Sequence, residues 1–182
     1  MAILIVLIVI VVLVLVVVGV YNGLIRLRNR VDSSWAQIDV QLKRRIDLIP
    51  NLVETVKGYA AHEKGTLDAV INARNAGMSA STPQQQAQAD NQITGALRQL
   101  FALSEAYPDL KANQNFAQLQ EELTATEGRV AYARQAYNDT VLKYNTKIQT
   151  FPSLVFANMM NFTKREYFEA EESAREAPRV QF

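Results

Sequence analysis

The residues of this chain that are best suited to chemistry are its single histidine and its carboxylates. His62 is followed by Glu63, but a helical zinc site of the H-E-x-x-H kind needs a second histidine, which the chain lacks. A di-iron site in a helical bundle would need two Glu-x-x-His elements. Gly65 and Thr66 lack the earlier glycine and the lysine of a phosphate-binding loop, and no G-x-S-x-G elbow occurs. We therefore expect no catalytic residue, no metal and no cofactor, and a protein that is not an enzyme.

The composition excludes further classes of function. No cysteine occurs, which excludes disulfides, iron–sulfur ligation and thiol catalysis and fits a cytoplasmic location. The net charge is +1, and the one basic cluster, Lys43-Arg44-Arg45, is balanced by Asp39 and Asp47 at helical spacing. A nucleic-acid partner is therefore not expected.

A group of charged residues around a proline is the candidate structural or partner surface. Its members are Arg44, Arg45, Asp47, Pro50, Glu54 and Glu63. They form either a binding or gating surface, or a half-buried ion network that fixes the register of packed helices, and the second interpretation is favoured. Because Glu63 falls on an apolar helical stripe, its carboxylate should meet an arginine or a tyrosine hydroxyl from a facing helix.

The elements that must position these residues begin with an apolar run. Residues 2–20 contain no charged or polar side chain and as a helix would span roughly 28 Å, close to the hydrocarbon thickness of a bilayer. A helix is expected despite the β-branched composition, because an isolated strand would leave its backbone groups unpaired in lipid. A cleaved signal sequence is the alternative, but the run has no preceding basic region and no A-x-A-like site. A retained membrane anchor is therefore predicted.

The residues that follow the run suggest its orientation. Three arginines occupy positions 26, 28 and 30 and are opposed only by Asp32. The positive-inside rule then favours a single-pass protein with its amino terminus outside and the rest of the chain in the cytoplasm. Gly19 and Gly23 have the small-residue spacing of close helix contacts, which makes them candidates for packing between anchors. Flexibility where the anchor meets the rest of the chain is an equal alternative.

A helical stripe of apolar residues continues after the run. Spacings of three and four lead from Leu24 to Ile49, and the same phase passes Pro50 and reaches Val70. A bent continuous helix that ends near residues 76–77 is favoured, and a hinge or break at the proline is the alternative.

Two further helices are expected after chain reversals. Ser81 or Thr82 can cap a helix with Pro83 at its first position, and the second reversal lies at residues 107–110. The expected buried stripe of this helix is Ile93, Leu97, Leu100, Ser104 and Tyr107. From about residue 110 to 150 a seven-residue repeat predicts a coiled-coil-like seam, formed by Phe116, Leu123, Val130, Tyr137, Tyr144 and Phe151. The aromatic segment 151–168 contains few basic residues, so it is expected to cap the bundle rather than lie on lipid.

Together these patterns predict an all-α fold. A transmembrane helix over residues 1–23 continues into an elongated antiparallel helical bundle over residues 24–162, and residues 163–182 form a carboxyl-terminal tail.

Several segments also resemble a known family. Residues 30–39 read Arg-Val-Asp-Ser-Ser-Trp-Ala-Gln-Ile-Asp, residues 47–54 read Asp-Leu-Ile-Pro-Asn-Leu-Val-Glu, and residues 177–182 read Ala-Pro-Arg-Val-Gln-Phe. In these segments and along the rest of its length the chain closely resembles the LemA family of bacterial membrane proteins. The resemblance implies an amino-terminal anchor, an antiparallel helical bundle and a location in the bacterial inner membrane. It implies no agreed biochemical activity, although one branch of the family is associated with magnetosome formation and family genes often neighbour those of a membrane metalloprotease.

The function predicted from these observations is that of a non-enzymatic scaffold, anchored in the lipid bilayer, that assembles into homo-oligomers through its helical seams. The alternative is an adaptor or regulator of a membrane-protein client such as a quality-control protease, or a protein that remodels the membrane locally. A scaffold should associate with copies of itself, whereas an adaptor should be a monomer that captures a different protein.

Overall fold

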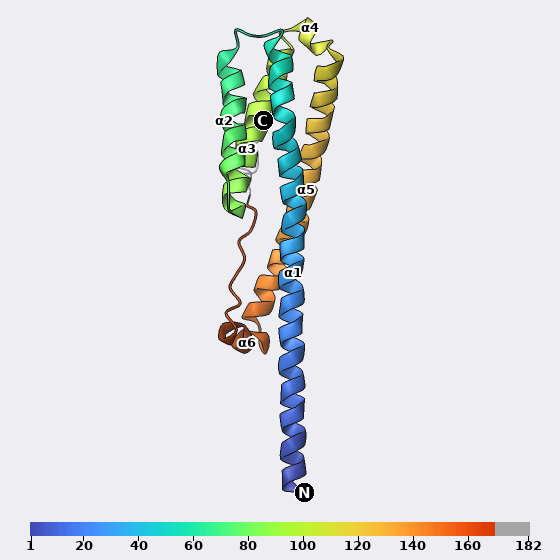
Figure 1. The fold of residues 1–182 in the computed structure, drawn as a ribbon, viewed down its shortest axis with the longest axis vertical. Coiled ribbons are helices and arrows are strands. Elements are labelled where there is room, and N and C mark those ends of the chain that lie inside the picture. The colour runs from blue at the N-terminus through green and yellow to red at the C-terminus, as the bar shows by residue number, and fades with distance from the viewer. Residues whose placement is uncertain (170–182) are drawn as a thin grey trace, which may run out of the picture. The chain divides into compact units, whose positions relative to one another are not determined.

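A computed structural model describes residues 1–169, and all regular elements in this range are helices (Figure 1). In chain order they are α1 (Ala2–Lys57), α2 (Lys64–Ser79), α3 (Pro83–Ser104), α4 (Pro108–Lys111), α5 (Gln114–Gln149) and α6 (Ser153–Met159). The predicted all-α fold, in which a long apolar amino-terminal helix precedes a helical bundle, is confirmed. The chain ending at residues 177–182 and most of the predicted tail lie outside the described residues.

The chain divides into two compact units. Unit 1 consists of Met1–Ala36 and Gln135–Glu166, and unit 2 consists of Gln37–Arg134 and Tyr167–Phe182. Both α1 and α5 therefore contribute residues to each unit.

The first helix passes through its proline without a reversal. Pro50 lies inside α1 and is exposed, while Ile49 and Leu52 beside it are fully buried. The helix ends at Lys57, where the backbone N–H groups of residues 59 and 60 both donate to the Val56 carbonyl. The favoured prediction of a helix that continues to residues 76–77 is therefore wrong, because the chain turns over residues 58–63 and α2 begins at Lys64.

The periodic spacing of apolar residues led to the wrong prediction of one continuous helix for a physical reason. Val56, Ala60, Leu67 and Val70 are all buried, as their spacing requires. Val56 nevertheless precedes the turn, Ala60 lies within it, and Leu67 and Val70 follow it. A tight reversal can therefore keep residues of the same periodic series facing one core. Gly58, directly after the last helical residue, was the one local signal of the break.

The reversal between α2 and α3 follows the predicted chemistry. Thr82 is the amino-terminal cap of α3, and its side chain accepts a hydrogen bond from the Gln85 backbone N–H at 3.2 Å. Pro83 occupies the first helical position, where its missing N–H costs nothing. α2 and α3 pack against each other, and the expected stripe of α3 is buried at residues 93, 97, 100 and 104.

The seven-residue repeat describes α5 well, except at its end. The repeat positions from Phe116 to Tyr144 are at most 2 % exposed. The helix starts later than predicted because Asn113 caps it, accepting a hydrogen bond from the Phe116 N–H at 3.0 Å. Phe151 was wrongly assigned to the seam: α5 ends at Gln149, and the Phe151 side chain is 84 % exposed.

Each unit has its own buried residues. The core of unit 2 gathers side chains from α1, α2, α3, α4 and α5, among them Leu52, Leu67, Leu100, Leu110 and Phe116. In unit 1, Leu24 and Val31 of α1 and Val141 and Tyr144 of α5 are at most 2 % exposed. The centroids of the Trp35 and Tyr137 rings lie 5.3 Å apart.

Candidate functional site

The most unusual side chain in unit 2 is a buried arginine on α1. Arg45 is 1 % exposed, and its guanidinium Nη1 donates to Asp90 Oδ1 of α3 at 2.6 Å. Its other terminal nitrogen lies 3.6 Å from Glu127 Oε2 of α5. A buried guanidinium is tolerated only when it is paired, so these two carboxylates explain how α1 can carry a charge on its inner face.

A cleft of about 300 Å³ adjoins this ion network. Its polar lining is Asp39, Lys43, Asp47, Arg74, Gln86 and Asp90, and its apolar lining is Leu42, Ile46, Gly77, Met78, Ala80, Ala89 and Ile93. The buried Gln86 Oε1 accepts no hydrogen bond from the described residues. A Cβ atom added to Gly77 would lie 3.0 Å from Ile46 Cδ1, so the glycine permits the close packing of α2 on α1 at the cleft wall.

The structure does not bring the predicted charged group together as one surface. Arg45 points into unit 2, whereas Arg44 is half-exposed and lies 3.8 Å from Glu122 Oε2. Asp47, Pro50 and Glu54 are exposed, and of these only Asp47 lines the cleft.

Glu63 lies away from this group, at the start of α2. Its Oε1 accepts a hydrogen bond of 3.0 Å from the Tyr107 hydroxyl, so the predicted tyrosine partner is confirmed. The partner comes from the residue that precedes α4 rather than from within a facing helix. The hydrogen bond to the Glu63 carboxylate, with desolvation and the nearby negative charge, raises the pKa of Tyr107.

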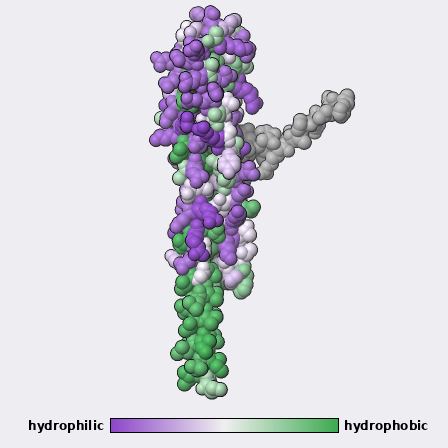
Figure 2. Space-filling model, turned by 90° about the vertical axis from the view of Figure 1, so that its right-hand side faces the viewer, coloured by the Kyte–Doolittle hydropathy of each residue, from purple (hydrophilic) through white to green (hydrophobic). Residues whose placement is uncertain are grey.

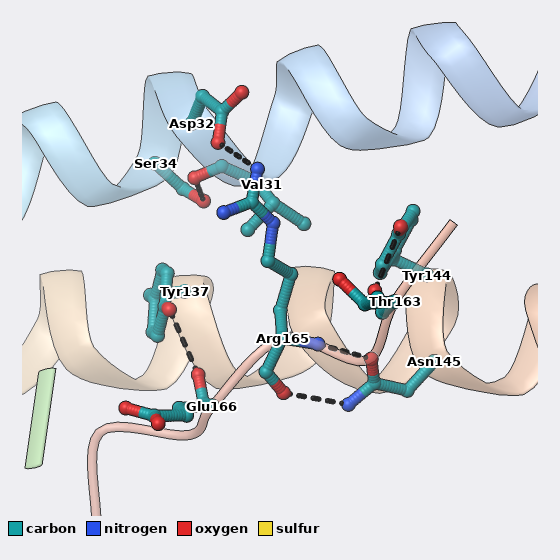
Figure 3. Close-up of polar contacts among 9 residues, drawn as sticks. All are labelled: Val31, Asp32, Ser34, Tyr137, Tyr144, Asn145, Thr163, Arg165 and Glu166. Atoms are coloured by element: carbon teal, nitrogen blue, oxygen red, sulfur yellow. Dashed lines mark hydrogen bonds and ion pairs between the residues drawn. The ribbon is translucent and has the colours of Figure 1, made fainter. Parts of the chain in front are cut away.

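In unit 1, the segment that follows α6 is held against α5 by side chains of that helix (Figure 3). Asn145 pairs with the backbone of Arg165: its Nδ2 donates to the Arg165 carbonyl and its Oδ1 accepts from the Arg165 N–H, both at 2.9 Å. The Tyr144 hydroxyl donates to the Thr163 carbonyl at 2.9 Å. We call residues 163–166 the strap.

Two further contacts fix the strap. The Tyr137 hydroxyl donates to the Glu166 carbonyl at 2.8 Å, and the Arg165 guanidinium lies 2.9 Å from Asp32 Oδ1 on α1 (Figure 3). Burial raises the pKa of both Tyr137 and Tyr144, and the positive charge of Arg165 partly opposes this effect. The neutral phenols are therefore kept as donors.

The strap was not predicted, although a signal for it was present. Tyrosines at two positions of a buried seven-residue repeat must find acceptors for their hydroxyl groups. The donors can be identified from the sequence as tyrosines. The acceptors are backbone carbonyls about 20 to 30 positions further along the chain, and no residue type marks them.

The polar contacts described above hold helices and the strap in place. Among residues 1–169, no group of three or more histidine, cysteine, aspartate or glutamate side chains could hold a metal ion. His62 is half of the H-E pair considered above and is exposed. A Cβ added to Gly19 or Gly23 would meet nothing within 4 Å, so packing between anchors stays a prediction.

These features define a class of all-helical protein. In this class a helix that is long and apolar enough to cross a bilayer continues directly into a helical bundle, and polar residues within the bundle hold its helices in place.

The chain belongs to the LemA family, whose model matches residues 34–182. It is 28 % identical to Protein LemA of Metamycoplasma hominis over 162 residues, which cover 87 % of this chain and 73 % of that protein. It is 24 % identical to Magnetosome protein MamQ 2 of Paramagnetospirillum magneticum over 184 aligned residues, covering 87 % of this chain and 67 % of the relative. Magnetosome protein MamQ of Magnetospirillum gryphiswaldense is 23 % identical with the same coverage. The resemblance found in the sequence is confirmed.

Proposed function

We infer that this LemA-family chain is a non-enzymatic scaffold, anchored in the bacterial inner membrane, that assembles with copies of itself. The observation that carries the proposal is the exposure of the first part of α1. The large apolar side chains from Ile3 to Val16 are 44–84 % exposed, and the most apolar stretch of the helix has no buried residue. Figure 2 shows this stretch as a zone of apolar surface. A lipid bilayer can cover the apolar side chains on every side of such a helix.

The energy of insertion supports an anchor. At roughly 0.3–0.6 kcal/mol for each isoleucine, leucine or valine near the bilayer centre, residues 2–20 would favour insertion by on the order of 6–10 kcal/mol. No other helix among the described residues is both long and apolar enough to cross a membrane.

The distribution of charge supports an orientation. Unit 1, which contains the apolar run, carries seven lysine or arginine residues and three aspartate or glutamate residues. Arg26, Arg28 and Arg30 belong to this excess. By the positive-inside rule, the amino terminus would lie outside and the helical bundle in the cytoplasm.

The continuity of α1 supports a scaffold. The helix that supplies the apolar run also supplies buried side chains such as Leu24 and Leu52 to the two units. An association between anchors would therefore be transmitted to the bundle through one helix.

The test of the scaffold is the mass of the full-length protein in mild detergent, measured by light scattering. The expected result is a discrete oligomer whose mass falls when Gly19 and Gly23 are both replaced by leucine. Val11→Leu, in the same apolar run, is the matched control and should leave the mass unchanged. A monomeric wild-type protein would overturn self-assembly.

The second candidate function, an adaptor for a membrane-protein client, is favoured by the cleft beside the buried ion network. The cleft combines an apolar wall with charged residues and with Gln86 Oε1, which has no hydrogen-bond partner among residues 1–169. A photo-crosslinker at Met78, which lines the cleft and is 61 % exposed, would identify the contact in intact membranes. One defined membrane protein as the product would support the adaptor, whereas a second copy of this chain would support the scaffold.

A further inference from the structure

We propose that α6 and the turn before it lie on the lipid surface, as an interfacial contact beside the point where α1 leaves the bilayer. The proposal rests on the membrane anchoring inferred above and adds a second membrane contact to it. Its partner is the boundary between lipid headgroups and acyl chains, with a preference for anionic lipid.

The exposed side of this segment is almost wholly apolar. Phe151 is 84 % exposed, Leu154 40 %, Val155 49 % and Met159 74 %. On the other side, Ser153 and Ala157 are at most 1 % exposed, at the spacing of one helical turn. The helix is therefore oriented by its buried side, and the apolar side chains on its outer side are exposed.

A contact with α1 places this segment near the end of the apolar run. The centroids of the Phe162 and Tyr21 rings lie 6.3 Å apart, and the rings are arranged edge to face. The Arg28 guanidinium lies 5.6 Å from the centre of the same ring. Tyr21 directly follows the apolar run, so α6, which ends three residues before Phe162, lies close to the level of the headgroups. Aromatic and arginine side chains are typical of this level.

The charge of unit 1 fits anionic lipid. Segment 151–168 itself contains only two basic residues, Lys164 and Arg165. The fold adds Lys143 and Lys147 from α5 and Arg26 from α1 to the same unit as Lys164. An apolar face accompanied by basic side chains is the composition of a helix that lies in the membrane interface.

Continuity with the anchor decides between lipid and a second copy of the chain. The apolar face of α6 belongs to the same compact unit as the apolar run, and Phe162, three residues after α6, contacts Tyr21, the residue that directly follows the run. A membrane that accommodates the run therefore brings its own surface to α6, without any further partner.

The experiment uses the full-length chain, which has no native cysteine. Met159→Cys is labelled with an environment-sensitive fluorophore and the protein is placed in vesicles of phosphatidylcholine and phosphatidylglycerol. Some vesicles contain lipid with a quencher near the headgroup end of its acyl chain. Since an interfacial helix sinks about 5–10 Å, this quencher should roughly halve the fluorescence. Tyr132→Cys, at a 78 % exposed position of α5, is the matched control and should keep its fluorescence.

A third position separates the failure of this proposal from that of the anchor. Leu15→Cys, within the apolar run, should be quenched by lipid that carries its quencher deep in the acyl chain. If Leu15 is quenched and Met159 is not, the α6 contact is wrong and the anchor stands. If neither is quenched, the anchor is wrong, and the α6 proposal falls with it. Fluorescence at Met159 that changes with protein density but not with the quencher would assign the face to a second copy and overturn the lipid contact.

Discussion

Replacement of Arg45 by methionine should destabilise the chain far more than the same change at its neighbour Arg44. Methionine keeps much of the arginine stem but leaves Asp90, whose side chain is 8 % exposed, without its partner at 2.6 Å. Removing one member of a buried ion pair costs about 3–5 kcal/mol. The Glu127 contact adds little to this, because that carboxylate is 49 % exposed and lies 3.6 Å away.

Arg44→Met is the matched control. Arg44 and Glu122 are 3.8 Å apart, with side chains that are 50 % and 37 % exposed, and such a surface pair contributes only about 0–1 kcal/mol. The two arginines are adjacent in the sequence, so the variants have the same composition and net charge and differ only in which side of α1 they change.

The assay is urea unfolding of the full-length protein in mild detergent, followed by circular dichroism. The double variant Arg45→Met/Asp90→Leu should recover most of the loss, since apolar replacement of a buried pair is often neutral or stabilising. The larger leucine has room because Asp90 lines the cleft. An Arg45→Met variant as stable as Arg44→Met would refute the reasoning, and so would a double variant that is no more stable than Arg45→Met.

Three further predictions concern the strap, the Glu63 contact and the α3 cap. Tyr144→Phe should lower the free energy of unfolding by about 1 kcal/mol at neutral pH by removing the hydrogen bond to the strap. The raised pKa of Tyr144 means that the folded chain keeps its phenol proton above about pH 10, where an unfolded tyrosine loses it, so wild-type stability should fall as pH rises through this range. Urea unfolding at several alkaline pH values should show a shallower fall for Tyr144→Phe, and an equal slope would contradict the assignment. Glu63→Gln should lower the pH at which Tyr107 ionises, because the neutral amide weakens the hydrogen bond that holds the phenol proton and removes the negative charge beside it. Titration of labelled tyrosine carbons by NMR would detect the change. Thr82→Ala should cost about 1 kcal/mol in the same unfolding assay by removing the cap on Gln85, and a variant as stable as the wild type would show that the cap is dispensable.

Local chemistry and periodicity correctly predicted α3, α5 and the apolar first part of α1. The Thr82 cap, the proline after it and the burial of α3 follow from residues that act within a few positions of one another. The seven-residue repeat of α5 likewise reflects a pattern that recurs about every two turns of the helix.

The failures occurred where the decisive partner is distant in sequence. Apart from Gly58, no residue near positions 58–63 indicates that Ala60 is buried in a reversal instead of within a longer helix. The strap depends on hydrogen bonds between Asn145 and the backbone of Arg165, twenty positions away. Because every residue has a backbone carbonyl, the sequence does not indicate which one is the partner.

Arg45 lies in a periodic series of buried residues, but periodicity alone does not predict that its charged side chain is buried. Leu24, Val31, Ile38, Arg45 and Leu52 are spaced by seven residues along α1, and each is at most 2 % exposed. A charged residue in such a series can be exposed by a local twist or buried with a partner, and only the carboxylate of Asp90 on α3 decides between these outcomes. Sliding α1 by one repeat would set Ile38 or Leu52 against that carboxylate and leave a charge unpaired. The ion pair therefore penalises wrong registers of α1 on α3, as a single polar residue does in a coiled-coil seam, even where an apolar pair would give greater stability.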